Sequence, residues 1–400
     1  MTRRIVPAQG LPVCFPGVPA AVVKGGLLFV STVTGVDSRH GRPVSGALPE
    51  QARQAYGNLG AVLSAAGATP ADVVKASEFV TSAENDQDIA GARRGFLGAD
   101  FPIPTSVAMP QVAGAGNLLS VDAIGVVRDG SRRKVLRPAG GPSGDLLSPS
   151  GVTKGAFLFT CRATAARRDV GTDQVVCTGT LAQQMAQIYD NMELVLKAAN
   201  ASFDDIVMTT EFVTTTEGYR ETSDVRRRLF KNGFPAATGV ICGGLGQPNA
   251  LIALEAVVVL DRDAARQIIN PGWPHYERYT FCPGIRRGDY LFISGATATE
   301  TDASGKVVVR GGVAVQAQLI YDRARAIVEA AGGAMKDIVH VTEYVTLLHA
   351  YDTVGAVRGQ VFGDAGPVGT GHGPAVSTVV VKGLLRPDAL IEIDAVAVLG

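Results

Sequence analysis

The chain has little charge and few aromatic residues. Only 18% of its 400 residues are charged, and its 37 Lys and Arg balance 37 Asp and Glu. A net charge of zero gives no bulk attraction to nucleic acid or to an anionic membrane. No basic run with interleaved aromatic residues marks a local groove for nucleic acid either. We therefore expect neither a nucleic-acid partner nor a membrane partner.

Metal-ligand and disulfide patterns are lacking too. The five cysteines form no C-x-x-C pair, and the five histidines show no zinc-ligand spacing. An odd number of scattered cysteines is typical of reduced thiols in a cytoplasm. No apolar run reaches the about 18 residues of a membrane helix, and the first residues lack the apolar run of a signal peptide. The sequence therefore predicts a cytoplasmic protein without metal or cofactor.

What the chain does contain is a threefold internal repeat. The motif E-[FY]-V-T begins at Glu78, Glu211 and Glu343, at steps of 133 and 132 residues. The same steps join two further sets of landmarks, Tyr56, Tyr189 and Tyr321, and Arg93, Arg226 and Arg358. This period fits a small domain and is far too long for a solenoid repeat. We place three units at residues 1–132, 133–264 and 265–400.

Each unit shows one order of expected elements, close to ββαβαββ. The first helix is expected over residues 51–66, 184–200 and 316–332, with Gly67 and Gly332 ending two of them. This order predicts an α+β unit with two helices on one face of a mixed sheet. The bare faces of three such sheets would associate around a pseudo-threefold axis. We therefore expect one chain to form a whole pseudo-trimer, as a monomer or as a dimer of whole chains.

The units resemble the Rid/YjgF family of small homotrimers with the chorismate-mutase-like fold. Three motifs carry the resemblance: the opening G-D-Y-L-F-I-S-G at 288–295, the helix motif Q-x-x-x-x-Y-x-N from Gln51 and from Gln184, and the ending L-I-E-I-D-A-V-A at 390–397. The resemblance implies three mixed sheets forming a pseudo-threefold barrel. It also implies an enzyme without cofactor, because the family's deaminases hydrolyse reactive imines and enamines in clefts between subunits.

The family's deaminases hold a substrate carboxylate with the arginine of a P-A-R-T motif. The corresponding residues here are Pro104, Ala237 and Val376, so the arginine is absent from all three units. This argues against the usual amino-acid-derived imine. The resemblance therefore implies a small imine, enamine or carbonyl metabolite that is deaminated, hydrolysed, isomerised or cyclised, as in a biosynthetic pathway. The alternative is a non-catalytic small-molecule-binding or stabilising protein with degenerate pockets.

The resemblance also implies the site residues. The acidic residues of the last strand, expected to be catalytic, are Asp122, Glu255 and Asp394. Expected substrate-binding residues are Thr105, Thr238 and Ser377 after the missing arginine, Phe281, Cys282, Ser294 and Gly295 in the opening of unit three, Cys161 and Arg162 in that of unit two, and the loop residue His372. In the family, each cleft takes its opening residues from one unit and its acidic residue from a neighbour. The first candidate cleft therefore joins Ser294-Gly295 to Glu255 or Asp122, and the second contains Arg162.

Three features have two readings each. Arg162 either supplies the lost anion contact or is a surface arginine at a strand end. Cys161 is either a nucleophile activated by that charge or an inert buried thiol. The E-[FY]-V-T glutamates are either catalytic or paired with the arginine 15 residues later, which lies on the apolar stripe of the second helix. That stripe faces the sheet, so we favour a buried ion pair.

Overall fold

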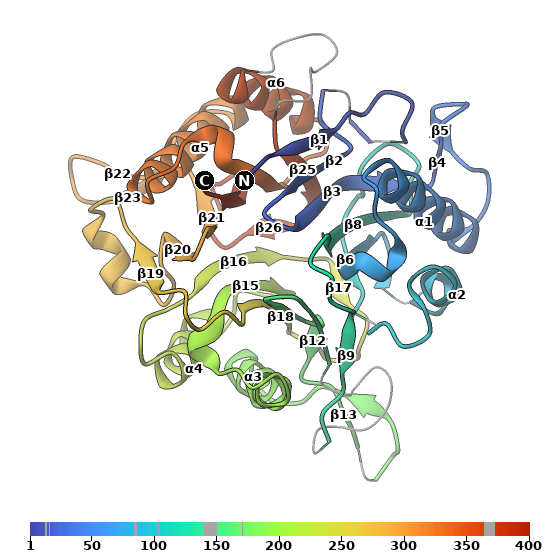
Figure 1. The fold of residues 1–400 in the computed structure, drawn as a ribbon. Coiled ribbons are helices and arrows are strands. Elements are labelled where there is room, and N and C mark those ends of the chain that lie inside the picture. Colours follow the sequence, from blue (N-terminus) through green and yellow to red (C-terminus); the bar gives the residue numbers. More distant parts are fainter. Residues whose placement is uncertain are drawn as a thin grey trace.

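Three sheet-and-helix units surround a common centre, with their helices on the outside (Figure 1). The computed structural model describes residues 1–12, 14–15, 17–83, 86–102, 104–139, 150–169, 171–363 and 373–400. Each unit carries two helices on one face of a mixed sheet, and the units follow one another around the centre. The predicted α+β fold of three tandem units is confirmed.

Unit one supplies six strands of a seven-stranded sheet, together with two helices and a small hairpin. Its elements are β1 (Arg4–Val6), β2 (Ala21–Lys24), β3 (Leu27–Thr34), the hairpin β4 (Val36–Asp37) and β5 (Arg42–Pro43), α1 (Leu48–Ala65), β6 (Val73–Val80), α2 (Asp86–Leu97), β7 (Val107–Ala108) and β8 (Leu119–Val126). The strand order is β1-β2-β3-β8-β6-β7-β17, where β17 belongs to unit two. The opening strand β3 is therefore a direct neighbour of the last strand β8.

Units two and three repeat this plan. Unit two has β9 (Lys134–Leu136), β10 (Gly151–Lys154), β11 (Phe157–Thr160), β12 (Ala163–Thr164), β13 (Arg167–Arg168), β14 (Val175–Val176), α3 (Leu181–Ala198), β15 (Ile206–Val213), α4 (Thr222–Leu229), β16 (Ala236–Ile241), β17 (Gly244–Leu245) and β18 (Ile252–Val259). Unit three has β19 (Arg266–Ile269), β20 (Gly284–Arg287), β21 (Tyr290–Thr297), β22 (Thr299–Thr301), β23 (Val307–Val309), α5 (Val313–Ala330), β24 (Ile338–Val345), α6 (Ala350–Phe362), β25 (Ala375–Val380), β26 (Gly383–Leu384) and β27 (Ile391–Val398).

The first helix of each unit begins three residues earlier than predicted, at Leu48, Leu181 and Val313. The glutamine that we predicted as the helix start lies inside the first turn, and its side chain hydrogen-bonds to residues outside the helix. In unit one, the Gln51 side-chain oxygen accepts the backbone N–H of Leu118 at 2.8 Å, which ties the helix to the last strand. The predicted helix ends are correct, because Gly67 and Gly332 follow the C-caps with positive φ of 61° and 83°.

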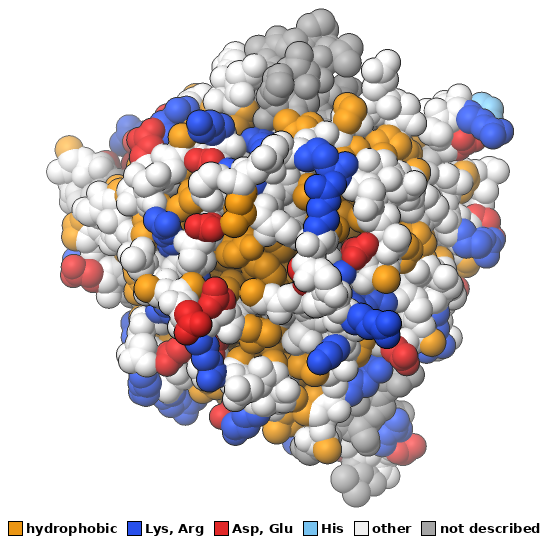
Figure 2. Space-filling view, in the orientation of Figure 1, with side chains coloured by type: hydrophobic (Ala, Val, Ile, Leu, Met, Phe, Trp, Pro, Cys, Tyr) orange, Lys and Arg blue, Asp and Glu red, His pale blue; other side chains and the backbone are white. Residues whose placement is uncertain are grey.

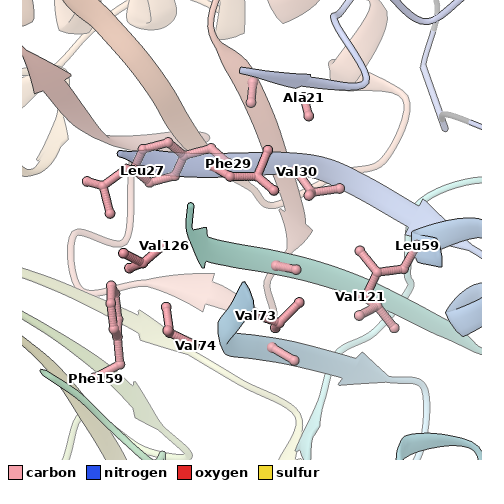
Figure 3. Close-up of a cluster of buried hydrophobic side chains, with 14 of the residues drawn as sticks. Ala21, Leu27, Phe29, Val30, Leu59, Val73, Val74, Val121, Val126 and Phe159 are labelled. Carbon is pink, nitrogen blue, oxygen red and sulfur yellow. The ribbon is translucent and has the colours of Figure 1, made fainter. Parts of the chain in front are cut away.

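The three sheets are linked in a ring within one chain. Strand β17 of unit two pairs with β7 of unit one, and β26 of unit three pairs with β16 of unit two. An isolated bridge between Gln111 and Val380 joins unit one to unit three. The apolar core also crosses a unit boundary, since Phe159 of unit two lies beside Val74 of unit one (Figure 3).

A buried ion pair joins the central strand to the second helix in every unit. The shortest distances between guanidinium and carboxylate are 2.5 Å for Arg93–Glu78, 2.5 Å for Arg226–Glu211 and 2.7 Å for Arg358–Glu343. A tyrosine hydroxyl donates to each carboxylate, from Tyr56, Tyr219 and Tyr321 respectively. The favoured reading of the E-[FY]-V-T glutamates as structural ion-pair partners is confirmed.

The linked sheets predict the oligomeric state of the protein in solution. We expect sedimentation velocity and light scattering to give a particle of one chain, or a dimer of whole chains, because one chain supplies all three sheets. The size should not change between micromolar and nanomolar concentrations if the particle is a monomer. An obligate trimer of chains would contradict this arrangement.

Candidate functional site

Three junctions between units correspond to the predicted clefts, and in each the opening strand of one unit meets an edge strand of another. We name them cleft A (units one and two), cleft B (units two and three) and cleft C (units three and one). In cleft B the backbone N–H of Ala237 donates to Ser294 Oγ at 2.8 Å, and in cleft C that of Val376 donates to Ser31 Oγ at 2.9 Å. In cleft A the N–H of Thr105 donates to the carbonyl of Arg162 at 3.0 Å. These bonds fix the direction of the threefold arrangement.

The acidic residue of each cleft comes from the unit that supplies the opening strand. Asp394 accepts a hydrogen bond from Thr238 at 2.9 Å, and the same hydroxyl accepts the N–H of Gly295 at 3.1 Å. The predicted pairing of Ser294-Gly295 with Glu255 or Asp122 is therefore wrong. The reason is topological: the opening and last strands of one unit, such as β21 and β27, are hydrogen-bonded neighbours, so their side chains stay together.

Arg162 fills cleft A. Its side chain is buried, and its Cζ lies 4.5 Å from the ring centroid of Phe212 and 5.1 Å from that of Phe79. Its Nε is 3.3 Å from one oxygen of Glu255, and Lys75 Nζ is 2.8 Å from the other. Burial alone would raise the pKa of Glu255, but these two cations lower it. The reading of Arg162 as a surface residue is thus wrong.

Two other predicted residues of cleft A, Cys161 and Thr105, have surroundings that fit a structural role. Burial raises the pKa of the Cys161 thiol to about 12, which fits an inert thiol rather than a nucleophile. The Thr105 carbonyl accepts a hydrogen bond from Arg162 Nη1 at 3.4 Å, so Thr105 helps to hold the guanidinium. Beside the guanidinium, cleft A keeps a cavity of about 20 Å³, and Cys161, Arg162 and Glu255 are among the residues that line it.

Side chains also close cleft C. The hydroxyl of Thr32 donates to Asp122 at 2.5 Å and accepts the N–H of Thr378 at 3.0 Å. The ring of Phe15 stacks on Tyr351 with centroids 3.5 Å apart. Ser377 bonds His340 Nε2 at 3.0 Å. His372, predicted beside unit three's pocket, lies outside the described residues.

Cleft B has glycine at both facing positions. Gly295 stands where the other openings have Thr32 and Arg162, and Gly239 stands where the other edge strands have Thr378 and Ser106. A Cβ at Gly295 would come within 2.3 Å of Glu392 Oε1 and 2.9 Å of Thr238. Only glycine therefore lets the Glu392 carboxylate reach the backbone of the opening strand.

Glu392 is the site residue that the sequence reasoning missed. In strand register it pairs with Tyr344, and the equivalent positions in units one and two hold Ser120 and Ala253. The available signal was the E-I-D alternation, because residues two apart on a strand share a face. Glu392 and Asp394 are both buried on the inner face of β27.

The two carboxyls of cleft B have different proton affinities. Burial and the charge of Asp394 raise the pKa of Glu392 to about 8, although the N–H of Gly239 opposes the shift. Burial also raises the pKa of Asp394, but the hydroxyls of Thr342 and Thr238 limit the rise to about 6. Near neutral pH the site therefore holds one protonated carboxyl and one carboxylate, as an acid–base pair requires.

Aromatic side chains border this cleft. The short helix η5 (Pro274–Arg278) leads into Phe281, whose ring stacks on Tyr279 at 5.0 Å and meets Tyr276 edge-on at 5.6 Å. Burial raises the pKa of Tyr276 to about 12, and the charge of Glu392 adds to the rise. Tyr276 also shares a small cavity with Ser294, so the cluster lies near this junction. Cys282 is buried, its N–H donates to the carbonyl of Pro235, and burial raises its pKa to about 12, so it joins units rather than reacting.

The described residues were also compared with the requirements for a metal site and for a membrane-spanning helix. Among these residues, no group of three or more His, Cys, Asp or Glu has the geometry to hold a metal ion. None of the described helices has the length and apolar character needed to cross a membrane.

Comparisons with known proteins find the same threefold repeat in the chain. The family model of endoribonuclease L-PSP matches three times, at residues 17–127, 148–260 and 276–399. A RutC family protein of Pyrococcus horikoshii is 28% identical over 117 residues, which span 29% of this chain and 85% of that protein. A 2-iminobutanoate/2-iminopropanoate deaminase of Capra hircus is 26% identical over 129 residues, which span 32% of this chain and 91% of that protein.

One solved structure resembles most of the chain. A chorismatase crystal structure covers 82% of this chain and 93% of its own, with a TM-score of 0.52 and 16% identity. This likeness shows a shared fold.

Proposed function

The chain belongs to the endoribonuclease L-PSP family, and from this premise we propose that it hydrolyses a small imine or enamine in cleft B. The observation that carries the proposal is the buried Glu392–Asp394 pair on one face of β27, packed against Gly295 and Thr238. The raised pKa of each carboxyl supports it. Curated relatives named as imine deaminases support the reaction class. Of the three clefts, cleft B alone combines this pair with glycine at both facing positions.

The chemistry would use Glu392 as the acid. The protonated carboxyl donates its proton to the imine nitrogen, which gives an iminium ion and leaves a carboxylate. This carboxylate takes a proton from water as the water oxygen attacks the carbon, and the carbinolamine forms. Glu392 then passes that proton to the nitrogen, the C–N bond breaks as the carbinolamine hydroxyl returns its proton to the Glu392 carboxylate, and a carbonyl compound and ammonia leave. Asp394, held as an anion by Thr238, stabilises the positive charge of the iminium ion.

The substrate we propose lacks a carboxylate. Ala237 stands at the family's arginine position, and its backbone N–H already bonds Ser294. The Asp394 carboxylate in the cleft would repel a substrate anion and favour a neutral or protonated imine. The aromatic cluster around Phe281 offers an apolar surface for the rest of the molecule.

Ala237→Arg tests this proposal, because it recreates P-A-R-T beside Glu392. We expect wild type to accelerate hydrolysis of butan-2-imine, in which a methyl group replaces the carboxylate, and to leave 2-iminobutanoate nearly untouched. The variant should gain at least about tenfold in kcat/KM for 2-iminobutanoate, equivalent to about 1.4 kcal/mol of transition-state stabilisation. Imine loss can be followed by competition with semicarbazide trapping.

Val376→Arg is the matched control, since it places arginine at the same position of cleft C, which lacks Glu392. We expect no gain from it. Equal gains from both variants would contradict a specialised cleft B. Saturable imine binding by wild type without hydrolysis would favour the non-catalytic alternative.

A further inference from the structure

A cavity lies on the pseudo-threefold axis, where the inner faces of the three sheets meet. Its volume is about 70 Å³, and all three units contribute to its walls. Asp122, Glu255 and Asp394, predicted for separate clefts, all line this one space. Hydrophobic side chains gather at the centre of the face shown in Figure 2, around the axis. The volume suits several waters or one small ligand.

Two hydroxyls that line the cavity have no partner. Ser77 and Thr210 are only 9% and 8% exposed. Across the residues that the structure describes, no group hydrogen-bonds to either side chain. Ser77 lies directly opposite Asp122 in the sheet, and Thr210 lies opposite Glu255. Buried hydroxyls are normally hydrogen-bonded, so these two point to an occupant of the cavity.

The charges in the cavity do not balance locally. Lys75 and Arg162 both contact Glu255, so these three groups together carry one excess positive charge. Asp122 and Asp394 accept hydrogen bonds from hydroxyls and have no cation of the described residues at ion-pair distance, although burial raises the pKa of each and the charge of Lys75 opposes the rise. The donors are Thr32 and Ser377 for Asp122, and Thr238, Thr342 and Tyr344 for Asp394.

The remaining basic group in the wall adds no positive charge. Burial lowers the pKa of His340 to about 3, so its ring is neutral. Its Nε2 bonds Ser377, and the ring stacks on Phe29 at 5.0 Å. Two carboxyl groups therefore face the cavity without a cation in contact.

We propose that this cavity binds a small organic ammonium ion. Its N–H groups would donate to the Asp122 carboxylate and to the hydroxyls of Ser77 and Thr210. Its apolar group would lie against Phe79 and Phe212, whose rings already accept one cation, Arg162. The site is separate from cleft B, although Asp394 borders both.

Titration with methylammonium chloride tests the proposal, with sodium chloride at equal ionic strength and methanol as controls. Saturation-transfer NMR should show bound methylammonium, and the melting temperature should rise to a plateau with methylammonium only. Asp122→Asn keeps the shape of the side chain but removes its charge, and should weaken binding at least about tenfold, or about 1.4 kcal/mol. Asp37→Asn, at an exposed carboxylate, should leave binding unchanged.

Ser77→Ala gives a second test if Asp122→Asn does not fold, and it should weaken binding severalfold. Equal effects of sodium chloride, methanol and methylammonium would overturn the proposal and leave the cavity with water only. So would undiminished binding in both Asp122→Asn and Ser77→Ala.

Discussion

Glu392→Gln is expected to lower kcat for imine hydrolysis by about a hundredfold to ten-thousandfold, the usual contribution of a general acid. Glutamine keeps the shape of the side chain and can still accept the N–H of Gly239, but it has no proton to give. The measurement is the rate of imine loss under substrate saturation. The same substitution should make the protein more stable in alkaline solution.

The gain in stability follows from the direction of the pKa shift. Glu392 has a pKa of about 8 in the fold against a usual value of 4.5, so the folded state holds the proton more tightly. This contribution to stability is fully present below about pH 4.5 and is lost as the pH rises through about 8. A shift of this size corresponds to about 3–5 kcal/mol. Glutamine never ionises, so urea unfolding near pH 9 should show the variant more stable than wild type.

The pH dependence of wild-type activity should reflect the same pair. Hydrolysis needs Asp394 ionised and Glu392 protonated, so kcat/KM should fall below about pH 6 and above about pH 8. The two carboxyls interact, so these limits belong to the pair rather than to either residue alone. In Glu392→Gln, the alkaline limit should disappear from the residual rate.

The other two acidic positions provide matched controls. Asp122→Asn and Glu255→Gln change carboxylates of clefts C and A, and each should keep activity within about threefold of wild type, whereas Asp394→Asn should lose at least about tenfold. Equal partial losses for all the carboxylate variants would show three equivalent sites and contradict a single working cleft. Full activity in Glu392→Gln would remove this residue from the mechanism.

The sequence predicts much of the fold because its repeats carry physical constraints. Glu211 and Arg226 are separated by the same 15 residues as their counterparts in the other units, and the arginine lies on an apolar helix stripe. A charge on such a stripe needs a buried partner, and the nearby strand offers one. The 2.5 Å ion pair follows from this pattern without any knowledge of long-range contacts.

The site is harder to predict because it depends on which strands become neighbours. The family resemblance assigned Ser294-Gly295 an acidic partner from a neighbouring unit, and the sequence could not correct this because spacing does not say that β21 lies between β20 and β27. It also cannot tell that Arg162 points inward between two phenylalanine rings, because an arginine at a strand end is usually exposed. Glu392 could have been predicted from the sequence, because strand alternation places it on the same face as Asp394.

Arg226→Met is expected to lower the free energy of unfolding by about 3–5 kcal/mol, because it leaves Glu211 buried without its cation. Arg226 also donates to Thr280 of unit three at 3.4 Å, so the loss includes a link between units. Urea unfolding at neutral pH measures the change. Arg227→Met, one residue along the same helix, breaks an exposed ion pair with Asp224 of 3.5 Å and should cost less than about 1 kcal/mol.

A double variant separates the unpaired charge from lost packing. Combining Glu211→Leu with Arg226→Met removes both charges, and should recover most of the stability that Arg226→Met alone loses, since apolar side chains of similar volume often replace a buried ion pair without net cost. If the double variant is as unstable as the sum of the two single variants, packing and not the buried charge sets the cost. If Arg226→Met costs no more than Arg227→Met, the ion pair does not stabilise the unit, and the conserved spacing of these residues along the three repeats needs another physical reason.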